Sequence, residues 1–473
     1  MMVSVSSAEE LSNDDSMVGL NNVNSMDELS LANSGDEILG AGNSWYVKAD
    51  ATGGDGSEDS PYGNLKTAYN KAQSGDTIYI MNGTYNGLNN LNIEFLKENL
   101  QLKAYADSYP IFDGQNTNRI FDISAKGMLI SGLIFINAVS KDSFGVQGSV
   151  MDIYASNVII DNCTFKNNIA AGTNAAFQRA GAIYVYASGS NAIIKNSQFI
   201  NNTAKNDGGA IFIASNAQNS QILYCNFTDN VAERSAGAIC NWGRNTVIDR
   251  CNFKGSQSKS TSTTYTGGSI FSVLNVNVTN SEFNNDYSKA LGGSINIYRS
   301  GTGSLIENCT FTGSESSNGG AISTFASITI KNNKFTGCEG YAIAGAIFLG
   351  ASDSNLDSNT FRYNTARNGG AIVIYEGESN NNITNSIFYG NKILDDGENG
   401  GAIYSYGSNT LYENNTFFNN VAKGYGGAII ELVSAANTTI NNCSFTYNYA
   451  NREDGLGGAY YSALSNILWV VIY

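Results

Sequence analysis

Few side chains in this 473-residue sequence are suited to catalysis. Histidine is absent, which removes the usual general base of hydrolases and the commonest zinc ligand. Carboxylates, arginines, lysines and tyrosines remain. Beyond the N-terminal region, carboxylates gather in three short segments, 53–59, 394–399 and 451–455. Any metal or acid–base chemistry would therefore depend on oxygen donors in these segments or elsewhere.

The segment 394–399 is the best candidate for a cation site. Asp395, Asp396 and Glu398 could ligate Ca²⁺, which prefers hard oxygen donors. Nothing nearby supplies the remaining ligands, so a solvated turn is the alternative interpretation. No other cofactor is expected.

The charge balance restricts the partners. With 26 Lys and Arg against 41 Asp and Glu, the formal net charge is -15. Such a chain repels nucleic acid, anionic lipid and polyuronate chains. We expect glycans, neutral ones above all, or cell-surface proteins as partners, with no nucleic-acid binding and no membrane insertion by this chain.

The N-terminal residues read as export and leader segments. Residues 1–8 predict the remnant of a secretory signal peptide, with an ordinary disordered start as the alternative. Residues 9–43 carry eight acidic residues and no Lys or Arg, which predicts a disordered acidic leader. A secreted or cell-surface location follows from the first interpretation.

Two short sequence motifs, called phrases below, alternate strictly along the chain. One is Gly-Gly-Ala-Ile and its variants; the other is Ile-x-Asn-Cys/Ser/Asn-x-Phe, and each occurs eleven times. Length varies mainly between the Phe of one phrase and the glycines of the next, as expected for a loop on one face of a solenoid. The second glycine of each pair lies at 181, 209, 237, 268, 293, 320, 345, 370, 401, 427 and 458.

One repeat contains three β-prone runs, for example 157–160, 163–167 and 182–186. Three strands per coil predict an all-β, single-stranded right-handed parallel β-helix, a pectin-lyase-like solenoid; a propeller needs about 40 residues per blade. The glycines are expected to supply positive φ at the corner before the third strand. Phenylalanines are expected to stack inside as a structural ladder: Phe165, Phe199, Phe227, Phe253, Phe283, Phe311, Phe335, Phe361, Phe388, Phe417 and Phe445.

The repeats define the remaining boundaries. Residues 126–466 are expected to form the repeats, and 467–473 a truncated last coil. Residues 44–125 are expected to form the N-terminal cap and first coils. Within them, 65–72 has the apolar spacing of a short amphipathic helix that covers the end of the core.

Strand alternation predicts an outer aromatic row. If the Ile of Gly-Gly-Ala-Ile points inward, the residues one and three positions after it point outward. Such a row could stack on sugar rings or pack against a partner protein. Cover by the variable loop, or inward packing after a one-residue register error, are the alternatives. The predicted ligand-binding residues are Tyr184, Tyr186, Trp242, Phe271, Tyr298, Phe325, Tyr375, Tyr404 and Tyr406.

The phrases carry a family resemblance. Phe-x-x-Asn, as in Phe199/Asn202, alternates with Gly-Gly-Ala-Ile, and this resembles the repeats of chlamydial polymorphic outer membrane proteins and the adhesin-like surface proteins of methanogens. The opening, with Gly75-Asp76-Thr77-Ile78 and Gly83-Thr84-Tyr85, is similar to that of pectate-lyase-like β-helix proteins. The resemblance implies an exported, adhesin-like surface protein.

Three functions remain open. The favoured one is a non-catalytic surface protein that binds glycans or protein partners through loops or the aromatic row. A polysaccharide lyase or glycoside hydrolase on the same scaffold is the alternative, and a structural cell-wall component is the third. Lyases of the resembled kind combine Ca²⁺-binding carboxylates with an Arg or Lys base. Arginines 179, 250, 299 and 362 lie at different points of the repeat, with no aligned acidic group beside them.

Overall fold

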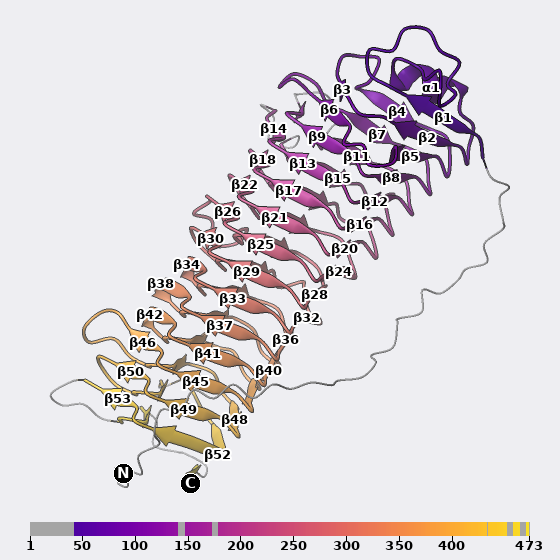
Figure 1. The fold of residues 1–473 in the computed structure, drawn as a ribbon. Coiled ribbons are helices and arrows are strands. Elements are labelled where there is room, and N and C mark those ends of the chain that lie inside the picture. The colour runs from indigo at the N-terminus through magenta and orange to yellow at the C-terminus, as the bar shows by residue number, and fades with distance from the viewer. Residues whose placement is uncertain are drawn as a thin grey trace, which may run out of the picture. The chain divides into compact units, whose positions relative to one another are not determined.

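The described part of the chain is one continuous solenoid. The computed structural model describes residues 42–140, 147–172, 178–432, 434–451, 457–463 and 470–472. From Gly42 onward they form a single unit, in which strands pair in parallel with their equivalents in neighbouring coils (Figure 1). The predicted signal remnant (1–8) and all but the last two residues of the predicted leader (9–43) lie outside the described residues.

From β8 (Leu129–Ser131) onward, each coil passes through four strand positions, in the order sheet A, sheet B, sheet D and sheet C, whereas the two described coils before it have no sheet D strand. Sheet A contains β1 (Ser44–Val47), β2 (Thr77–Ile80), β5 (Gln101–Ala104), β8 (Leu129–Ser131), β12 (Ile159–Asp161), β16 (Ile193–Lys195), β20 (Gln221–Leu223), β24 (Thr246–Asp249), β28 (Val276–Thr279), β32 (Ser304–Glu307), β36 (Ile328–Lys331), β40 (Asn355–Asp357), β44 (Asn382–Thr384), β48 (Leu411–Glu413), β52 (Thr439–Thr446) and β55 (Val470–Ile472). Sheet B contains β3 (Thr84–Tyr85), β6 (Ile111–Asp113), β9 (Ile134–Ile136), β13 (Thr164–Lys166), β17 (Gln198–Ile200), β21 (Asn226–Thr228), β25 (Asn252–Lys254), β29 (Glu282–Asn284), β33 (Thr310–Thr312), β37 (Lys334–Thr336), β41 (Thr360–Arg362), β45 (Ile387–Tyr389) and β49 (Thr416–Phe418), and β52 continues it.

The other two sheets complete the coil. Sheet D contains β10 (Val139–Ser140), β14 (Ile169–Ala170), β18 (Thr203–Ala204), β22 (Val231–Ala232), β26 (Gln257–Ser258), β30 (Tyr287–Ser288), β34 (Glu315–Asn318), β38 (Glu339–Ile343), β42 (Thr365–Asn368), β46 (Lys392–Ile393), β50 (Val421–Ala422) and β53 (Tyr449–Ala450). Sheet C contains β4 (Ile93–Phe95), β7 (Phe121–Ile123), β11 (Met151–Ile153), β15 (Ile183–Val185), β19 (Ile211–Ile213), β23 (Ile239–Asn241), β27 (Ile270–Ser272), β31 (Ile295–Ile297), β35 (Ile322–Thr324), β39 (Ile347–Leu349), β43 (Ile372–Ile374), β47 (Ile403–Ser405), β51 (Ile429–Glu431) and β54 (Tyr460–Ser462).

The predicted fold class is confirmed. The three runs expected in one repeat correspond to β12, β13 and β15. The short strands of sheet D, most of two residues, form a fourth position that the sequence analysis did not resolve. They follow the Phe-x-x-Asn phrase and turn the chain toward the variable loop. Parallel strands joined by crossovers take the right-handed path.

The phenylalanines stack in one internal column. From Phe165 to Phe445, successive ring centroids are 4.6–4.9 Å apart and the planes differ by 2–8°. This is the coil-to-coil spacing of a parallel sheet. Upstream, Phe135, Phe112 and Tyr85 extend the column. Each fully buried Phe stabilises the fold by about 1.5–3 kcal/mol.

Asparagine amides form a second internal column and explain the Asn of Phe-x-x-Asn. Asn202 Nδ2 donates to Phe165 O at 3.0 Å and to Asn230 Oδ1 at 3.0 Å. Asn391 repeats the pattern with Phe361 O and Asn420 Oδ1, at 3.1 and 2.9 Å. These fully buried side chains therefore find partners only when the next coil is in register.

The two glycines of each pair have different roles. The first position adopts positive φ, as at Gly208 (φ 68°), and Ala236 also adopts it (φ 59°). The second glycine faces the next coil: a Cβ on Gly209 would lie 2.0 Å from Gly237 O. The sequence analysis assigned the whole motif to positive φ, whereas the second glycine is required by close packing between coils.

The predicted capping helix is α1 (Leu65–Lys71). The side chain of Asn64 caps it by accepting a hydrogen bond from Thr67 N at 3.0 Å. Leu65 and Ala68 are fully buried in the main core, and Tyr69 packs its ring against Phe95 at 5.0 Å. The helix therefore covers apolar side chains at the first coils.

Two further features complete the scaffold. All seven cysteines are buried and free, and the backbone N–H groups of Cys163 and Cys251 each donate to a Ser hydroxyl of the next coil, so these cysteines act as small stacking residues. In the predicted last coil, β55 pairs with β52, while 467–469 and 473 lie outside the described residues. Within the described ranges, no helix has the length and apolar character needed to span a membrane.

Four successive residues without an amide interrupt the amide column, Ser256, Asp286, Ser314 and Cys338, and one of them carries a carboxyl group. Asp286 occupies the position of the stacked asparagines and is 1% exposed. Ser256 N donates to Oδ1 at 3.1 Å, and among the described residues Oδ2 has no hydrogen-bond partner. Burial raises the pKa of Asp286 to about 7.

We predict that Asp286→Asn stabilises the protein in a pH-dependent manner. Because the folded-state pKa is raised from 3.8 to about 7, the stability of the natural chain falls as pH rises through that window. The amide should gain roughly 1–3 kcal/mol at pH 8 and little at pH 4. Urea unfolding at both pH values measures this, with Asn391→Asp as the reverse control. An equal gain at both pH values would contradict the assignment.

Candidate functional site

The predicted aromatic residues do project from the outer side of sheet C or from its edge. In β15, Ile183 and Val185 belong to the main core, and Tyr184 points to the opposite side. Most of these aromatics gather into two satellite clusters. The larger surrounds Tyr184, Phe212 and Phe271, and the smaller surrounds Phe348.

The predicted exposure of this row is wrong for part of it. Tyr184 and Phe271 are buried, at 6% and 0% exposure, so they cannot form an open ligand surface. Tyr375, at 49%, is the most exposed. The other predicted residues are half-buried: Tyr186, Trp242, Tyr298, Phe325, Tyr404 and Tyr406.

The cover comes from the connections between sheets D and C. The Arg179 guanidinium lies over the rings of Phe212 and Trp242, at 4.9 and 5.0 Å from their centroids. Its Nε also donates to the fully buried Asp207 at 3.1 Å, and Arg234 Nε donates to the same carboxylate at 2.7 Å. Ion pairs thus fix the loops over the apolar rings, as the alternative interpretation of the row anticipated.

A second ion-pair group lies nearer the N-terminal end of sheet C. Arg119 Nη2 lies 2.8 Å from Asp152 Oδ2 and 3.0 Å from Asp122 Oδ1. Burial raises the pKa of the fully buried Asp152 to about 6, although Arg119 opposes this. Burial and then Asp152 raise the pKa of Tyr154 to about 12, and the same two causes raise that of Tyr186 further. The protonated phenols and the paired carboxylate form a compact internal network.

A groove on the outer side of the solenoid brings two predicted residues together. Phe325 and Tyr375 both line it, and Phe348 contacts both rings, at 5.6 and 5.4 Å between centroids. We call this the sheet C groove; it follows β31, β35, β39 and β43 and has a volume of about 470 Å³. Its lining is Arg299, Thr302, Phe325, Ala326, Ser327, Gly350, Ala351, Ser352, Tyr375, Glu376 and Glu378.

The polar groups of the sheet C groove are partly organised. Ser352 Oγ donates to Glu378 Oε2 at 2.9 Å, and the guanidinium of Arg299 lies 5.7 Å from the Tyr298 ring centroid. A Cβ on Gly350 would lie 3.0 Å from Phe325 Cδ1, so glycine leaves room for the ring. The groove therefore combines two accessible rings with hydroxyl, carboxylate and guanidinium groups.

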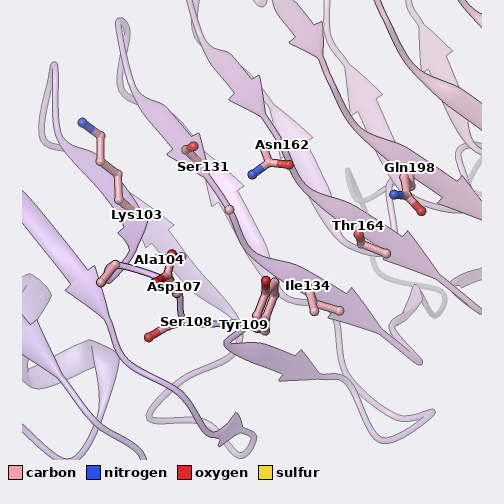
Figure 2. Close-up of a pocket in the computed structure, with 12 residues that line it drawn as sticks. Lys103, Ala104, Asp107, Ser108, Tyr109, Ser131, Ile134, Asn162, Thr164 and Gln198 are labelled. Carbon is pink, nitrogen blue, oxygen red and sulfur yellow. The ribbon is translucent and has the colours of Figure 1, made fainter.

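A second groove was missed by the sequence analysis. It has a volume of about 450 Å³ and lies where sheet A turns into sheet B, beside the connection 105–110. Figure 2 shows Tyr109 near Ile134, with Asn162, Thr164 and Gln198 along the following coils. Tyr109 is 71% exposed. Tyr109 lies in an irregular connection outside the repeat pattern, so the sequence does not indicate a site there.

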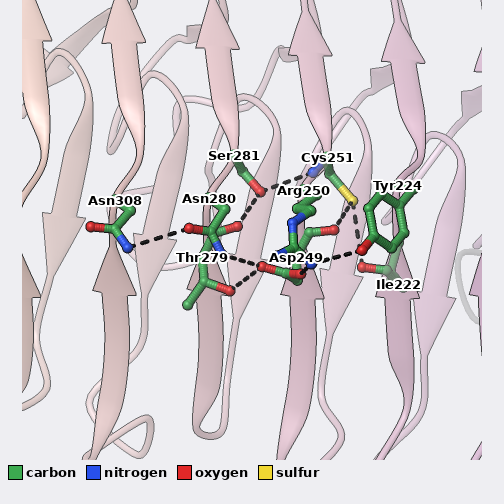
Figure 3. A network of polar contacts seen from close by, with 9 residues as sticks. All are labelled: Ile222, Tyr224, Asp249, Arg250, Cys251, Thr279, Asn280, Ser281 and Asn308. Atoms are coloured by element: carbon green, nitrogen blue, oxygen red, sulfur yellow. Dashed lines mark hydrogen bonds and ion pairs between the residues drawn. The ribbon is translucent and has the colours of Figure 1, made fainter. Parts of the chain in front are cut away.

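Two large side chains interrupt an outer asparagine column at the corner between sheets A and B. Tyr224 and Arg250 adopt positive φ (55° and 51°), where Asn280 and Asn308 occupy the equivalent positions. Arg250 Nη1 donates to Tyr224 Oη at 2.7 Å, while Asp249 accepts from Asn280 Nδ2 at 2.7 Å (Figure 3). The network links three coils at the surface and offers no open cavity.

The three carboxylates of the predicted calcium site do not converge. Each carboxylate has its own partner: Asp395 pairs with Arg367 at 2.6 Å, Asp396 pairs with Lys423 at 3.1 Å, and Glu398 accepts from Asn368 at 2.7 Å. In the ranges that the structure covers, no group of three or more acidic, Cys or His side chains could hold a metal ion. The three carboxylates therefore contact different partners, two basic side chains and one amide, from adjacent coils.

The other two acidic segments give no site either. In the first, Asp55 Oδ1 accepts from Ser57 Oγ at 2.7 Å and Ser57 N at 3.0 Å, which lowers its pKa and describes a surface turn. Of the segment 451–455, residues 452–455 lie outside the described residues.

Comparison with protein families confirms the resemblance. Residues 237–445 match the right handed beta helix region, and residues 196–214 match the Chlamydia polymorphic membrane protein repeat. The matched segments contain the Gly-Gly-Ala-Ile and Phe phrases. The chain is therefore a right-handed β-helix, and its residues 196–214 match one repeat of the polymorphic membrane protein type.

Individual relatives match only in part. A probable autotransporter of Escherichia coli, YfaL, is 33% identical over 109 residues, which cover 21% of this chain and 9% of that protein. A metabotropic glutamate receptor-like protein of Dictyostelium discoideum is 28% identical, covering 46% and 12%. The chain thus spans about a tenth of the length of these two relatives. An alginate lyase structure shares 16% identity, with a TM-score of 0.47 and coverage of 80% and 51%.

We predict that the Arg119–Asp152 pair is coupled. Arg119→Met leaves the buried Asp152 carboxylate without its cation and should destabilise the protein by about 3–5 kcal/mol. Asp152→Asn in the same chain should recover much of that loss. Urea unfolding of the two single variants and the double variant measures the coupling. Additive losses would show that the two side chains act independently.

Proposed function

We propose that this right-handed β-helix with polymorphic-membrane-protein-type repeats is a non-catalytic cell-surface protein that binds glycans in the sheet C groove. The observation that supports the proposal best is the pairing of Phe325 and Tyr375 in one open groove beside the Ser352 hydroxyl. Rings supply apolar contact area, and hydroxyl and carboxylate groups match sugar hydroxyls.

The proposed location has separate support. The polymorphic membrane protein repeat and the likeness to a probable autotransporter both favour export to the cell surface. Because the chain covers a small share of those proteins, the location and partners of the whole protein are proposals. Protease treatment of intact cells should remove an epitope within residues 178–432. Protection until the cells are lysed would contradict a surface location.

A glycan array tests binding in the sheet C groove. Wild-type protein should bind a defined subset of glycans, and Tyr375→Ala and Phe325→Ala should each weaken that binding about tenfold, equivalent to ~1.4 kcal/mol. Tyr341→Ala is the control, since Tyr341 is 42% exposed on sheet D, outside the groove. The control should bind as wild type does.

Two results would contradict glycan binding in the groove. Equal binding by the groove variants and by wild type would place the ligand elsewhere. Failure of wild type to bind any glycan would favour the protein-partner form of the proposal or a structural wall component.

A polysaccharide lyase remains the second candidate, because Arg299, Glu376 and Glu378 combine basic and acidic groups in the same groove. We expect no new reducing ends and no unsaturated products when the protein is incubated with neutral polysaccharides, pectin or alginate, with and without Ca²⁺. Products that appear with wild type and disappear in Arg299→Met would replace the binding proposal with a catalytic one.

A further inference from the structure

A second aromatic surface lies on the outer side of sheet B, away from the sheet C groove. Its rings form a continuous series over four coils: Tyr363–Tyr389 at 5.2 Å, Tyr389–Phe418 at 5.4 Å and Phe418–Tyr447 at 5.5 Å between centroids. Tyr363 and Tyr447 are 51% and 64% exposed. We call these four residues the sheet B aromatic row.

The two outer tyrosines occupy backbone positions that favour other residues. Tyr363 and Tyr447 follow β41 and β52 with φ of 56° and 55°. The equivalent residues after other sheet B strands include Asn167, Asn201 and Gly313. Asn and Gly adopt positive φ readily, whereas a bulky residue does so at a cost in free energy. The backbone is therefore strained at both tyrosines, each of which places a ring at the surface. Such strain is an indication of function.

The neighbouring coil makes room for the first of these rings. A Cβ on Gly390 would lie 2.8 Å from Tyr363 Cδ1 and Cε1, so the ring lies against the Gly390 backbone. The planes of Tyr363 and Tyr447 are turned 79° and 86° from their ring neighbours, while Tyr389 and Phe418 are parallel within 3°. Three coil steps of about 4.8 Å separate the outer rings, which makes about 14 Å.

The sheet B strands that carry the row present mainly polar side chains and no carboxylate. The outward residues of the same strands are Thr360, Arg362, Ile387, Thr416, Ser444 and Thr446. At the opposite edge of sheet B runs an exposed amide column, in which Asn414 Nδ2 donates to Asn385 Oδ1 at 3.1 Å and Asn442 Nδ2 to Asn414 Oδ1 at 2.7 Å. The column ends on a carboxylate, since Asn385 Nδ2 also donates to Asp357 Oδ1 at 2.7 Å. In a chain of net charge -15, the four strands of the row themselves carry one cation, Arg362, and no anion.

We infer that the sheet B aromatic row binds a neutral polysaccharide chain laid along the axis of the solenoid. The rings of the row follow one another at the fixed coil-to-coil step, and a polymer likewise has a regular repeat. Each ring can offer an apolar face to a sugar ring. Hydroxyls and amides beside the rings can exchange hydrogen bonds with sugar hydroxyls. With one arginine and no carboxylate, the strands of the row carry too little charge to hold a polyanion or a polycation. This site does not depend on the sheet C groove.

The matched test uses asparagine, the residue that the repeat itself uses at this position. Tyr363→Asn/Tyr447→Asn removes both outer rings and replaces them with a residue suited to positive φ, so the melting temperature should be unchanged or higher. Retention on cellulose, mannan and chitin suspensions should show binding of wild type to at least one polymer. The double variant should bind that polymer at least tenfold more weakly.

Two controls separate this site from others. Tyr224→Asn removes an equally exposed tyrosine with φ of 55° at another corner and should leave polymer binding unchanged. Tyr375→Ala should also retain polymer binding while its glycan-array binding weakens about tenfold, so the two sites succeed or fail separately.

Three outcomes would overturn the inference. The first is no retention of wild type on any of the three polymers. The second is equal retention of wild type and the double variant. The third is a wild-type dimer in light scattering that the double variant dissociates, which would make the row an interface between copies of this chain.

Discussion

The register between successive coils is the constraint on which the rest of the structure depends. Parallel hydrogen bonding sets a step of about 4.8 Å, and the internal columns satisfy it with stacked phenylalanine rings and amides that donate to the next coil. The second glycine of each pair permits this approach, since a Cβ there would collide with the next backbone. A solenoid whose interior is fixed in this way can vary only at its corners, connections and outer faces.

The internal columns were predictable because each depends on a residue type at a fixed point of the repeat. The Phe column, the inward isoleucines of sheet C and the helix over the first coils all follow from spacing. Burial of the outer residues was not predictable in this way. Tyr184 and Phe271 alternate outward as expected, yet Arg179 and Tyr265 from variable connections pack over their cluster. The geometry of the connections is set by tertiary contacts rather than by the period of the sequence repeat.

The surface features were not predictable from the sequence for related reasons. Tyr363 and Tyr447 stand in positions that read as turn residues, so their rings were not assigned to any face. Tyr109 lies in an irregular connection. The carboxylates near Asp395 appeared as a cluster because they are close in sequence, but basic residues of adjacent coils, Arg367 and Lys423, pair with them separately. Contacts between coils join residues about 28 positions apart in the sequence. These contacts decide which side chains are exposed and which are paired.

The proposed function depends on exposed rings that would hold an intact glycan on a rigid scaffold. A crystal structure of the protein soaked with a neutral hexasaccharide tests this most directly. We expect an uncleaved sugar chain against Phe325 and Tyr375, or along Tyr363, Tyr389, Phe418 and Tyr447. A cleaved product in either place, or sugar bound only away from these rings, would contradict it.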